Sequence, residues 1–226
     1  MTIKTKEKTA LVFGFTGLVG GILTNLLLED ERYSKVKVFL RKRNDFKHPK
    51  LEVVVNELEN INEIEKEIKG DDLFCCLGTT MKKAGSKTEF EKVDLHLPVT
   101  IARIASRNGV NKFLVVSSIG AAKKSSGFYL RTKGRMEEAI VKFPFGQISI
   151  FRPSLLLGKR SELRRGEVFG RFLALSMGFL LKGPLKKYRP IHAEKVARAM
   201  IRLANMLNAP VIYESDKIEE MGSQKL

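Results

Sequence analysis

Short apolar runs of strand length alternate along the chain with stretches in which apolar residues recur every three or four positions. The apolar runs predict β-strands, and the longer spacing predicts amphipathic helices. The predicted strands cover 10–13, 35–40, 51–55, 73–77, 113–116, 148–151 and 211–213. The predicted helices cover 18–28, 57–69, 94–108, 129–141, 168–181 and 193–206. A basic loop is expected over 81–88, and the polar tail from Glu214 is expected to fray.

The alternation of strands and helices predicts the fold class. Strands that alternate with helices form βαβ units, in which the strands run parallel and helices cover both faces of the sheet. We therefore expect an α/β, doubly wound, mainly parallel sheet with the strand 10–13 in a central position. The chain of 226 residues is expected to form a single domain over 1–226. The segment 153–190 breaks the alternation, and we expect it to form a small C-terminal substrate lobe above the carboxyl ends of the strands.

A glycine-rich turn follows the first predicted strand. Glycines recur at Gly14, Gly17 and Gly20, directly between the strand and the helical pattern. Such a turn lets the backbone approach an anion, and the free N–H groups of the first helical turn then point at that anion. A dinucleotide pyrophosphate is the usual ligand, and a strand–helix turn without a ligand is the alternative. The predicted cofactor-binding residues here are Gly14, Phe15, Thr16, Gly17, Leu18, Val19 and Gly20.

Basic residues follow the second predicted strand, where a cofactor ribose is expected. Arg41, Lys42 and Arg43 come directly after Leu40, and no carboxylate precedes Asp45. An NAD site places an acidic side chain here, whereas the 2′-phosphate of NADP is bound by arginine. The sequence therefore predicts a preference for NADP(H), with Arg41 and Arg43 as contacts. A solvated basic turn is the alternative.

A second group of polar residues follows the fifth predicted strand. That strand ends in Ser117 and Ser118, and the next helix begins with Tyr129 and Lys133 four positions apart. Residues at this spacing share one face of a helix, where an ammonium stabilises a neighbouring phenolate. Tyr129, Lys133 and Ser118 are therefore the candidate catalytic residues. Ser117 would replace Ser118 if the strand pleat turned the other way, and an ordinary solvated helix face is the alternative.

Composition limits the other classes of function. Cys75 and Cys76 are adjacent and poorly placed to pair, and His48, His96 and His192 lack the spacing of metal ligands, so no metal site is expected. We find neither a membrane-spanning run nor a signal peptide, and we expect a cytoplasmic protein.

The formal net charge is +16, without a nucleic-acid motif, which makes nucleic acid an unlikely partner. A solvated basic surface or a protein partner is the alternative explanation. If basic residues flank the site, they would steer an anionic substrate and cofactor toward it. The candidates are Lys82, Lys83, Arg160, Arg164 and Arg165.

These motifs resemble the atypical short-chain dehydrogenase/reductases, and more closely the group of Tat-interacting oxidoreductase-like proteins and their bacterial relatives. The most specific part is the run from Cys75 to Thr80. The resemblance implies a Rossmann-type domain that binds NAD(P)H, with Tyr129 as acid/base, Lys133 on the nicotinamide ribose and Ser118 or Ser117 on the substrate. Further cofactor contacts are expected at Leu77, Gly78 and Thr79, and further substrate contacts at Pro153 and Ser154.

The sequence departs from the family pattern at two places. Phe15 stands where a small residue is usual, and Asn56-Glu57 replaces the usual aspartate after the third strand.

Together these features favour an NADP(H)-dependent oxidoreductase acting on a small carbonyl or alcohol. An NADPH-binding regulatory or scaffold protein with little turnover is the second hypothesis, and a nucleotide-sugar epimerase-like enzyme is the third. The predicted helix 168–181 is either a cover for the substrate site or a membrane-surface helix. Either a monomer or a dimer is compatible with the sequence.

Overall fold

The computed structural model describes residues 7–42, 45–158, 183–207 and 209–224. Its centre is a seven-stranded sheet with the strand order β3-β2-β1-β4-β5-β6-β9, in which every neighbouring pair is parallel. The strands are β1 (Lys8–Phe13), β2 (Tyr33–Leu40), β3 (Leu51–Val55), β4 (Asp72–Cys75), β5 (Lys112–Val116), β6 (Gln147–Arg152) and β9 (Ile212–Glu214). The chain leaves β1 toward β2 on one side and later returns to β4 on the other, so the predicted doubly wound sheet with an interior first strand is confirmed.

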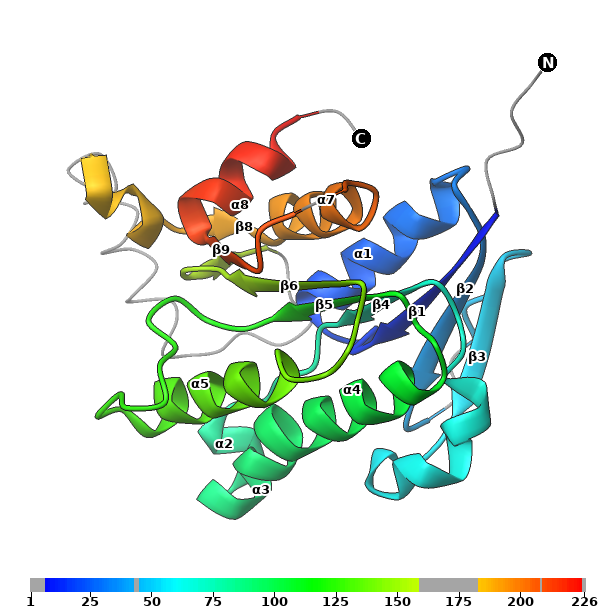
Figure 1. Cartoon of the computed structure of the whole chain (residues 1–226), viewed down its shortest axis with the longest axis horizontal. Coiled ribbons are helices and arrows are strands. Elements are labelled where there is room, and N and C mark those ends of the chain that lie inside the picture. Colours follow the sequence, from blue (N-terminus) through cyan, green and yellow to red (C-terminus); the bar gives the residue numbers. More distant parts are fainter. Residues whose placement is uncertain (1–6, 43–44, 159–182, 208, 225–226) are drawn as a thin grey trace.

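Helices cover both faces of this sheet (Figure 1). One face carries α1 (Leu18–Glu29), α7 (Ala193–Ala204) and α8 (Ser215–Gly222), and the other carries α4 (Leu97–Arg107) and α5 (Phe128–Ile140). The alternation of side chains along β1 builds the two cores. Ala10 and Val12 join the cluster under α1 and α7, whereas Leu11 and Phe13 join the cluster on the opposite face. Both faces of β1 are therefore dry, as a near-continuous apolar strand requires.

Two predicted segments have a different local structure. The helix expected over 57–69 is a 3-10 helix, η1 (Leu58–Glu67), with non-helical backbone at Asn60 and Ile64. Its end is held by the side-chain amide of Asn108, which donates hydrogen bonds to the carbonyl oxygens of Glu65 and Ile68. These tertiary contacts fix the backbone of this segment, and the helical spacing of its apolar residues does not predict them.

The prediction of a loop over 81–88 is also wrong, because two short helices form there. They are α2 (Met81–Ala84) and α3 (Lys87–Glu91), and each is capped by the hydroxyl of the residue before it. Thr80 accepts a hydrogen bond from the N–H of Lys83, and Ser86 accepts one from the N–H of Glu89. A π-helical turn, η2 (Lys92–His96), then leads into α4.

The prediction that the C-terminal tail frays from Glu214 onward is wrong. Residues Ser215–Gly222 form α8, in which Ile218 is fully buried. Gly222 packs so closely on α7 that a Cβ atom would overlap the carbonyl group of Lys195. The tail is therefore ordered by packing on α7, which the few apolar residues of this polar segment do not predict.

The predicted substrate lobe lies partly outside the described residues. The described parts of 153–190 are β7 (Leu156–Leu157), which pairs in parallel with β8 (Ile191–His192), and the 3-10 helix η4 (Gly183–Tyr188). The predicted helix 168–181 lies outside the described residues. Within the described ranges, no helix combines the length and the apolar character needed to cross a membrane.

Candidate functional site

The turn after β1 is built from glycines for steric reasons. Gly14 has φ +91°, and a Cβ atom there would lie 2.5 Å from the carbonyl oxygen of Cys76 at the end of β4. A Cβ atom on Gly20 would overlap the carbonyl oxygen of Gly14, which already accepts a hydrogen bond from the N–H of Gly17 at 2.9 Å. The glycines thus let α1 start directly against the ends of two adjacent strands, where the sheet order reverses.

The N-terminus of α1 is open to a ligand. Gly17 is the N-cap residue, and within the described structure no side chain caps this end of the helix. Thr16 and Gly17 are exposed, so the first N–H groups of the helix face a position where an anion can bind. This arrangement fits a pyrophosphate at the predicted glycine turn.

The apolar residues predicted beside that ligand have different environments. Val19 is buried in the core under α1, whereas Phe15 packs in a tilted contact with Phe46, their ring centroids 6.1 Å apart. Leu18 packs against Gly158, where a Cβ atom would lie 2.8 Å from the leucine side chain. Val19 is therefore a core residue, whereas Phe15 and Leu18 are half-buried and pack at the margin of the same core.

The end of β2 carries the residues predicted to select the cofactor. Arg41 directly follows the strand and is exposed, and Arg43 lies outside the described residues. Beside this strand end, the backbone N–H of Asn56 donates a hydrogen bond to the carbonyl oxygen of Leu40 at 2.9 Å. The side-chain oxygen of Asn56 is buried and has no hydrogen-bond partner among the described residues. A ligand that donates a hydrogen bond, such as the amino group of an adenine, would satisfy it.

A buried ion pair lies at the end of β4. The Nζ atom of Lys133, on α5, is 2.8 Å from Oδ1 of Asp94, on η2. The other carboxylate oxygen, Oδ2, accepts a hydrogen bond from the N–H of Thr79 at 2.8 Å, and a Cβ atom on Gly78 would lie 3.5 Å from Oδ1. Lys133 is 3% exposed and Asp94 1% exposed. The structure thus brings together the predicted residues Gly78, Thr79 and Lys133 around an aspartate that sequence reasoning did not single out.

Lys133 keeps its charge despite this burial. Burial by itself lowers the pKa of the ammonium, but the carboxylate of Asp94 and the phenol of Tyr129 outweigh that effect, and the pKa lies above its ordinary value. Tyr129 is 40% exposed and its ring meets Phe90 edge to face, with the centroids 5.8 Å apart. A partly exposed phenol therefore stands one helical turn from a buried, charged lysine.

The two serines at the end of β5 have different environments. Ser117 is buried and its hydroxyl donates a hydrogen bond to Glu137 on α5. Glu137 also pairs with Arg152, at the end of β6, through two hydrogen bonds. Ser118 is partly exposed, and its described contact is a long one of 3.4 Å to the neighbouring carbonyl oxygen of Ile119. Ser117 is thus held in a structural network, whereas Ser118 lacks one among the described residues, and a substrate role for Ser118 stays a prediction.

The predicted substrate residues after β6 are also bound up within the fold. The carbonyl oxygen of Pro153 accepts a hydrogen bond from the N–H of Ile119 at 3.0 Å. The hydroxyl of Ser154 donates to the carbonyl oxygen of Arg189 and accepts a hydrogen bond from the hydroxyl of Ser215 at 3.1 Å. These contacts fix the segment beside Ser118, so a substrate role for Pro153 and Ser154 stays a prediction.

The basic residues predicted to flank the site are only partly described. Lys82 and Lys83 are exposed on α2, which follows the end of β4 by a few residues. Arg160, Arg164 and Arg165 lie outside the described residues. Electrostatic steering by this set therefore remains a prediction.

Comparison with known proteins agrees with this geometry. The family model described as NAD(P)H-binding matches residues 14–156. The chain is 35% identical over 172 residues to Protein HTATIP2 of Rattus norvegicus, a match that covers 74% of this chain and 71% of the relative. It is also 32% identical over 203 residues to "Protein FMP52, mitochondrial" of Debaryomyces hansenii, covering 87% of this chain and 88% of the relative.

Solved structures share the fold at low identity. MoeE5 in complex with UDP-glucose and NAD superposes with a TM-score of 0.68 at 15% identity, covering 95% of this chain and 81% of MoeE5. UDP-glucose 4-epimerase of Thermotoga maritima, solved with UDP-glucose, superposes with a TM-score of 0.69 at 16% identity, covering 96% and 84% of the two chains. At such identities the likeness establishes the architecture alone.

The relatives correct one prediction from the sequence. The predicted cytoplasmic location is contradicted by the FMP52 relatives, which are named mitochondrial. The prediction depended on not recognising a targeting segment, and that is weak ground for a location. The family itself is established by the matched model and by relatives above 30% identity: the chain belongs to the NAD(P)H-binding, Rossmann-type family that includes HTATIP2.

Proposed function

We propose that the protein is an NADP(H)-dependent oxidoreductase that interconverts a small carbonyl compound and its alcohol. The observation that carries the proposal is the arrangement at the end of β4. There, a buried charged lysine, Lys133, stands one helical turn from the partly exposed residue Tyr129. The glycine turn adjoins this place, because a Cβ atom on Gly14 would overlap the carbonyl group of Cys76, directly after β4. In this proposal, a cofactor held at the glycine turn extends along the strand ends toward these side chains.

The proposed roles follow from what each side chain can donate. When bound, the cofactor supplies or accepts the hydride at the carbon of the substrate. In the reductive direction, the hydroxyl of Tyr129 donates its proton to the carbonyl oxygen, and Ser118 donates a hydrogen bond to the same oxygen. The phenolate that forms is stabilised by the ammonium of Lys133 and regains a proton from solvent. Lys133 also holds the nicotinamide ribose.

A screen of small aldehydes and ketones for NADPH oxidation tests this proposal. Tyr129→Phe keeps the ring and its contact with Phe90 and removes the proton, so turnover should fall ~10²–10⁴-fold while NADPH binding persists. Tyr188→Phe is the matched control, because it makes the same change at another exposed tyrosine. Wild-type turnover by Tyr129→Phe would refute the catalytic role. Tight NADPH binding without turnover of any substrate would favour the regulatory hypothesis.

The preference for NADP(H) over NAD(H) is a separate part of the proposal. It is supported by Arg41, an exposed guanidinium at the end of β2 where a 2′-phosphate is bound in this architecture. Arg41→Ser should weaken NADPH binding roughly tenfold and leave NADH binding unchanged. Lys42→Ser, the neighbouring exposed position, is the control, and calorimetry measures both cofactors. Wild-type NADH binding equal to or tighter than NADPH binding would overturn the preference.

A further inference from the structure

Asp94 cancels the charge of the lysine that the proposed function places beside the nicotinamide. A buried ammonium without a partner would be expensive, and Asp94 supplies that partner at 2.8 Å. The carboxylate itself is fixed from a second side by the N–H of Thr79. The pair therefore has one geometry and a net charge near zero.

The position of the pair makes this neutrality relevant to a ligand. Asp94 accepts a hydrogen bond from the N–H of Thr79, and a Cβ atom on Gly78 would lie 3.5 Å from its Oδ1 atom. Gly78 and Thr79 lie in the segment after β4, at the edge of the sheet where the glycine turn lies. Both members of the pair are almost completely shielded from water, so solvent screens their charges weakly. A charge introduced or removed here would therefore act strongly on a neighbouring ligand.

We propose that Asp94 is a positioning residue that sets the balance between oxidised and reduced cofactor in this site. The inference rests on the proposed function, because it requires Lys133 to lie beside the nicotinamide. The nicotinamide ring carries a positive charge when oxidised and none when reduced. A bare ammonium repels the oxidised ring, whereas an ammonium paired with a carboxylate repels it far less. Asp94 thus lets the protein keep Lys133 charged without excluding NADP⁺.

Two single variants make predictions of opposite sign. Asp94→Asn keeps an oxygen for the N–H of Thr79 but leaves the charge of Lys133 unbalanced, so NADP⁺ should lose roughly tenfold more affinity than NADPH. Lys133→Met leaves the carboxylate of Asp94 unbalanced, which should shift the preference toward NADP⁺ by a similar factor. The measured quantity is the ratio of the Kd values of NADP⁺ and NADPH, obtained by calorimetry without substrate.

The double variant and a distant control separate charge from structure. Asp94→Asn combined with Lys133→Met removes both charges and should return the ratio to within about twofold of wild type. Asp72→Asn, in which a buried aspartate paired with Lys8 receives the same substitution, should leave the ratio unchanged. If Asp94→Asn does not fold, Lys133→Met and the double variant decide the question by the same ratio.

The outcomes distinguish this inference from the proposed function. Equal losses for both cofactor forms in the single variants, or a ratio that does not move, would overturn the role of Asp94 and leave the test with Tyr129→Phe untouched. Ratios that move in opposite directions and recover in the double variant would support it. They would do so even if no carbonyl substrate were turned over.

Discussion

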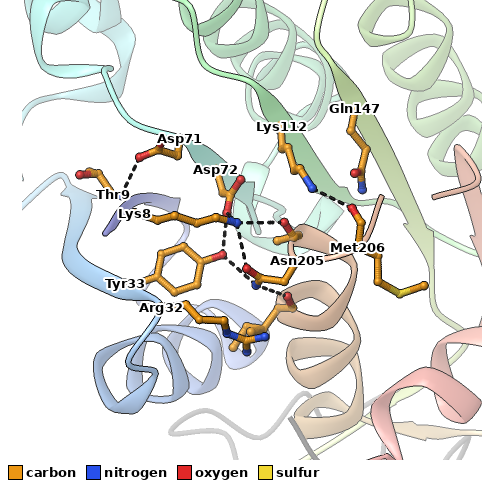
Figure 2. A network of polar contacts seen from close by, with 12 residues as sticks. Lys8, Thr9, Arg32, Tyr33, Asp71, Asp72, Lys112, Gln147, Asn205 and Met206 are labelled. Carbon is orange, nitrogen blue, oxygen red and sulfur yellow. Dashed lines mark hydrogen bonds and ion pairs between the residues drawn. The ribbon is translucent and has the colours of Figure 1, made fainter. Parts of the chain in front are cut away.

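The central sheet has an amino edge, where its strands begin, and a carboxyl edge, where they end. Similar residues lie at these two edges but serve different purposes. At the amino edge, where β1, β2 and β4 begin, Lys8, Tyr33, Asp72 and Asn205 converge (Figure 2). Oδ2 of Asp72 receives hydrogen bonds from the Tyr33 hydroxyl at 2.7 Å and from Lys8 Nζ at 3.0 Å. Asn205, at the end of α7, accepts a hydrogen bond from the same Lys8 ammonium at 2.9 Å. Each of these groups is occupied by another part of the fold.

At the carboxyl edge, polar groups remain available to a ligand. The hydroxyl of Ser118 makes one long contact, the oxygen of Asn56 has no partner among the described residues, and Tyr129 is partly exposed. The tyrosines show the contrast most clearly. Tyr33 is fully buried, and burial together with the carboxylate of Asp72 raises the pKa of its phenol far above the usual range. The same residue types, lysine, tyrosine and aspartate, thus close the sheet at one edge and form the candidate site at the other.

The largest expected effect separates a functional glycine from a structural one. Gly20→Ala places a methyl group against the carbonyl of Gly14, so the turn must move and NADPH affinity should fall at least ~100-fold. Gly109, near the amino edge, has φ +77° with open space around it. Gly109→Ala should cost about 1 kcal/mol of unfolding free energy and leave NADPH affinity unchanged. Calorimetry and urea unfolding measure both variants, and wild-type affinity in Gly20→Ala would refute the functional assignment.

The next effect tests the amino edge. Asp72→Asn removes the charge that Lys8 and Tyr33 share, and the free energy of unfolding should fall by about 2–3 kcal/mol. The cofactor Kd should not change, since no group of the carboxyl edge is disturbed. Tyr33→Phe should cost less, about 1–2 kcal/mol, because the Lys8–Asp72 pair survives. Unchanged stability in both variants, or a changed cofactor Kd, would contradict the assignment of a structural role to the amino edge and a binding role to the carboxyl edge.

Ser117 and Ser118, at the end of β5, allow a structural and a functional side chain to be compared at one strand end. Ser118→Ala should lower turnover roughly a hundredfold with unchanged stability, because its hydroxyl is free to bind the substrate oxygen. Ser117→Ala should instead cost about 1–2 kcal/mol of stability by removing a donor from buried Glu137, and turnover should persist. Urea unfolding and steady-state kinetics separate the two. Reversed phenotypes would mean that the pleat presents Ser117 to the substrate.

The smallest effect concerns the core between the edges. Burial raises the pKa of the Cys75 thiol to about 11, so the folded protein keeps the proton while an unfolded thiol loses it near pH 8.5. Stability contributed by this group is present below that pH and is lost as pH rises toward 11. The loss of unfolding free energy between pH 7 and pH 9.5 should be about 1 kcal/mol smaller in Cys75→Ala than in wild type. Equal losses would contradict a buried, protonated Cys75.

Much of the fold and part of the site follow from local sequence. The strand at 10–13 and the glycine turn after it can be predicted from the sequence, because a buried strand and a tight turn each require particular residues at adjacent positions. Lys133 was found because a helix places positions four apart on one face. Asp94 was not, because it lies 39 positions before Lys133 and no periodicity joins the two. The sequence also did not separate Ser117 from Ser118, because the partner that holds the Ser117 hydroxyl, Glu137, lies 20 positions after Ser117.

The sequence by itself determined the parallel α/β architecture, the glycine turn, and the candidate tyrosine, lysine and serines, because each depends on steric or periodic rules that act over a few residues. Tertiary structure alone decided that the tail forms α8, that Asp94 neutralises Lys133, and that Asp72 closes the opposite edge. Each of these depends on which segments pack together, since a buried charge is stable only beside a partner that the fold, and not the neighbouring sequence, supplies.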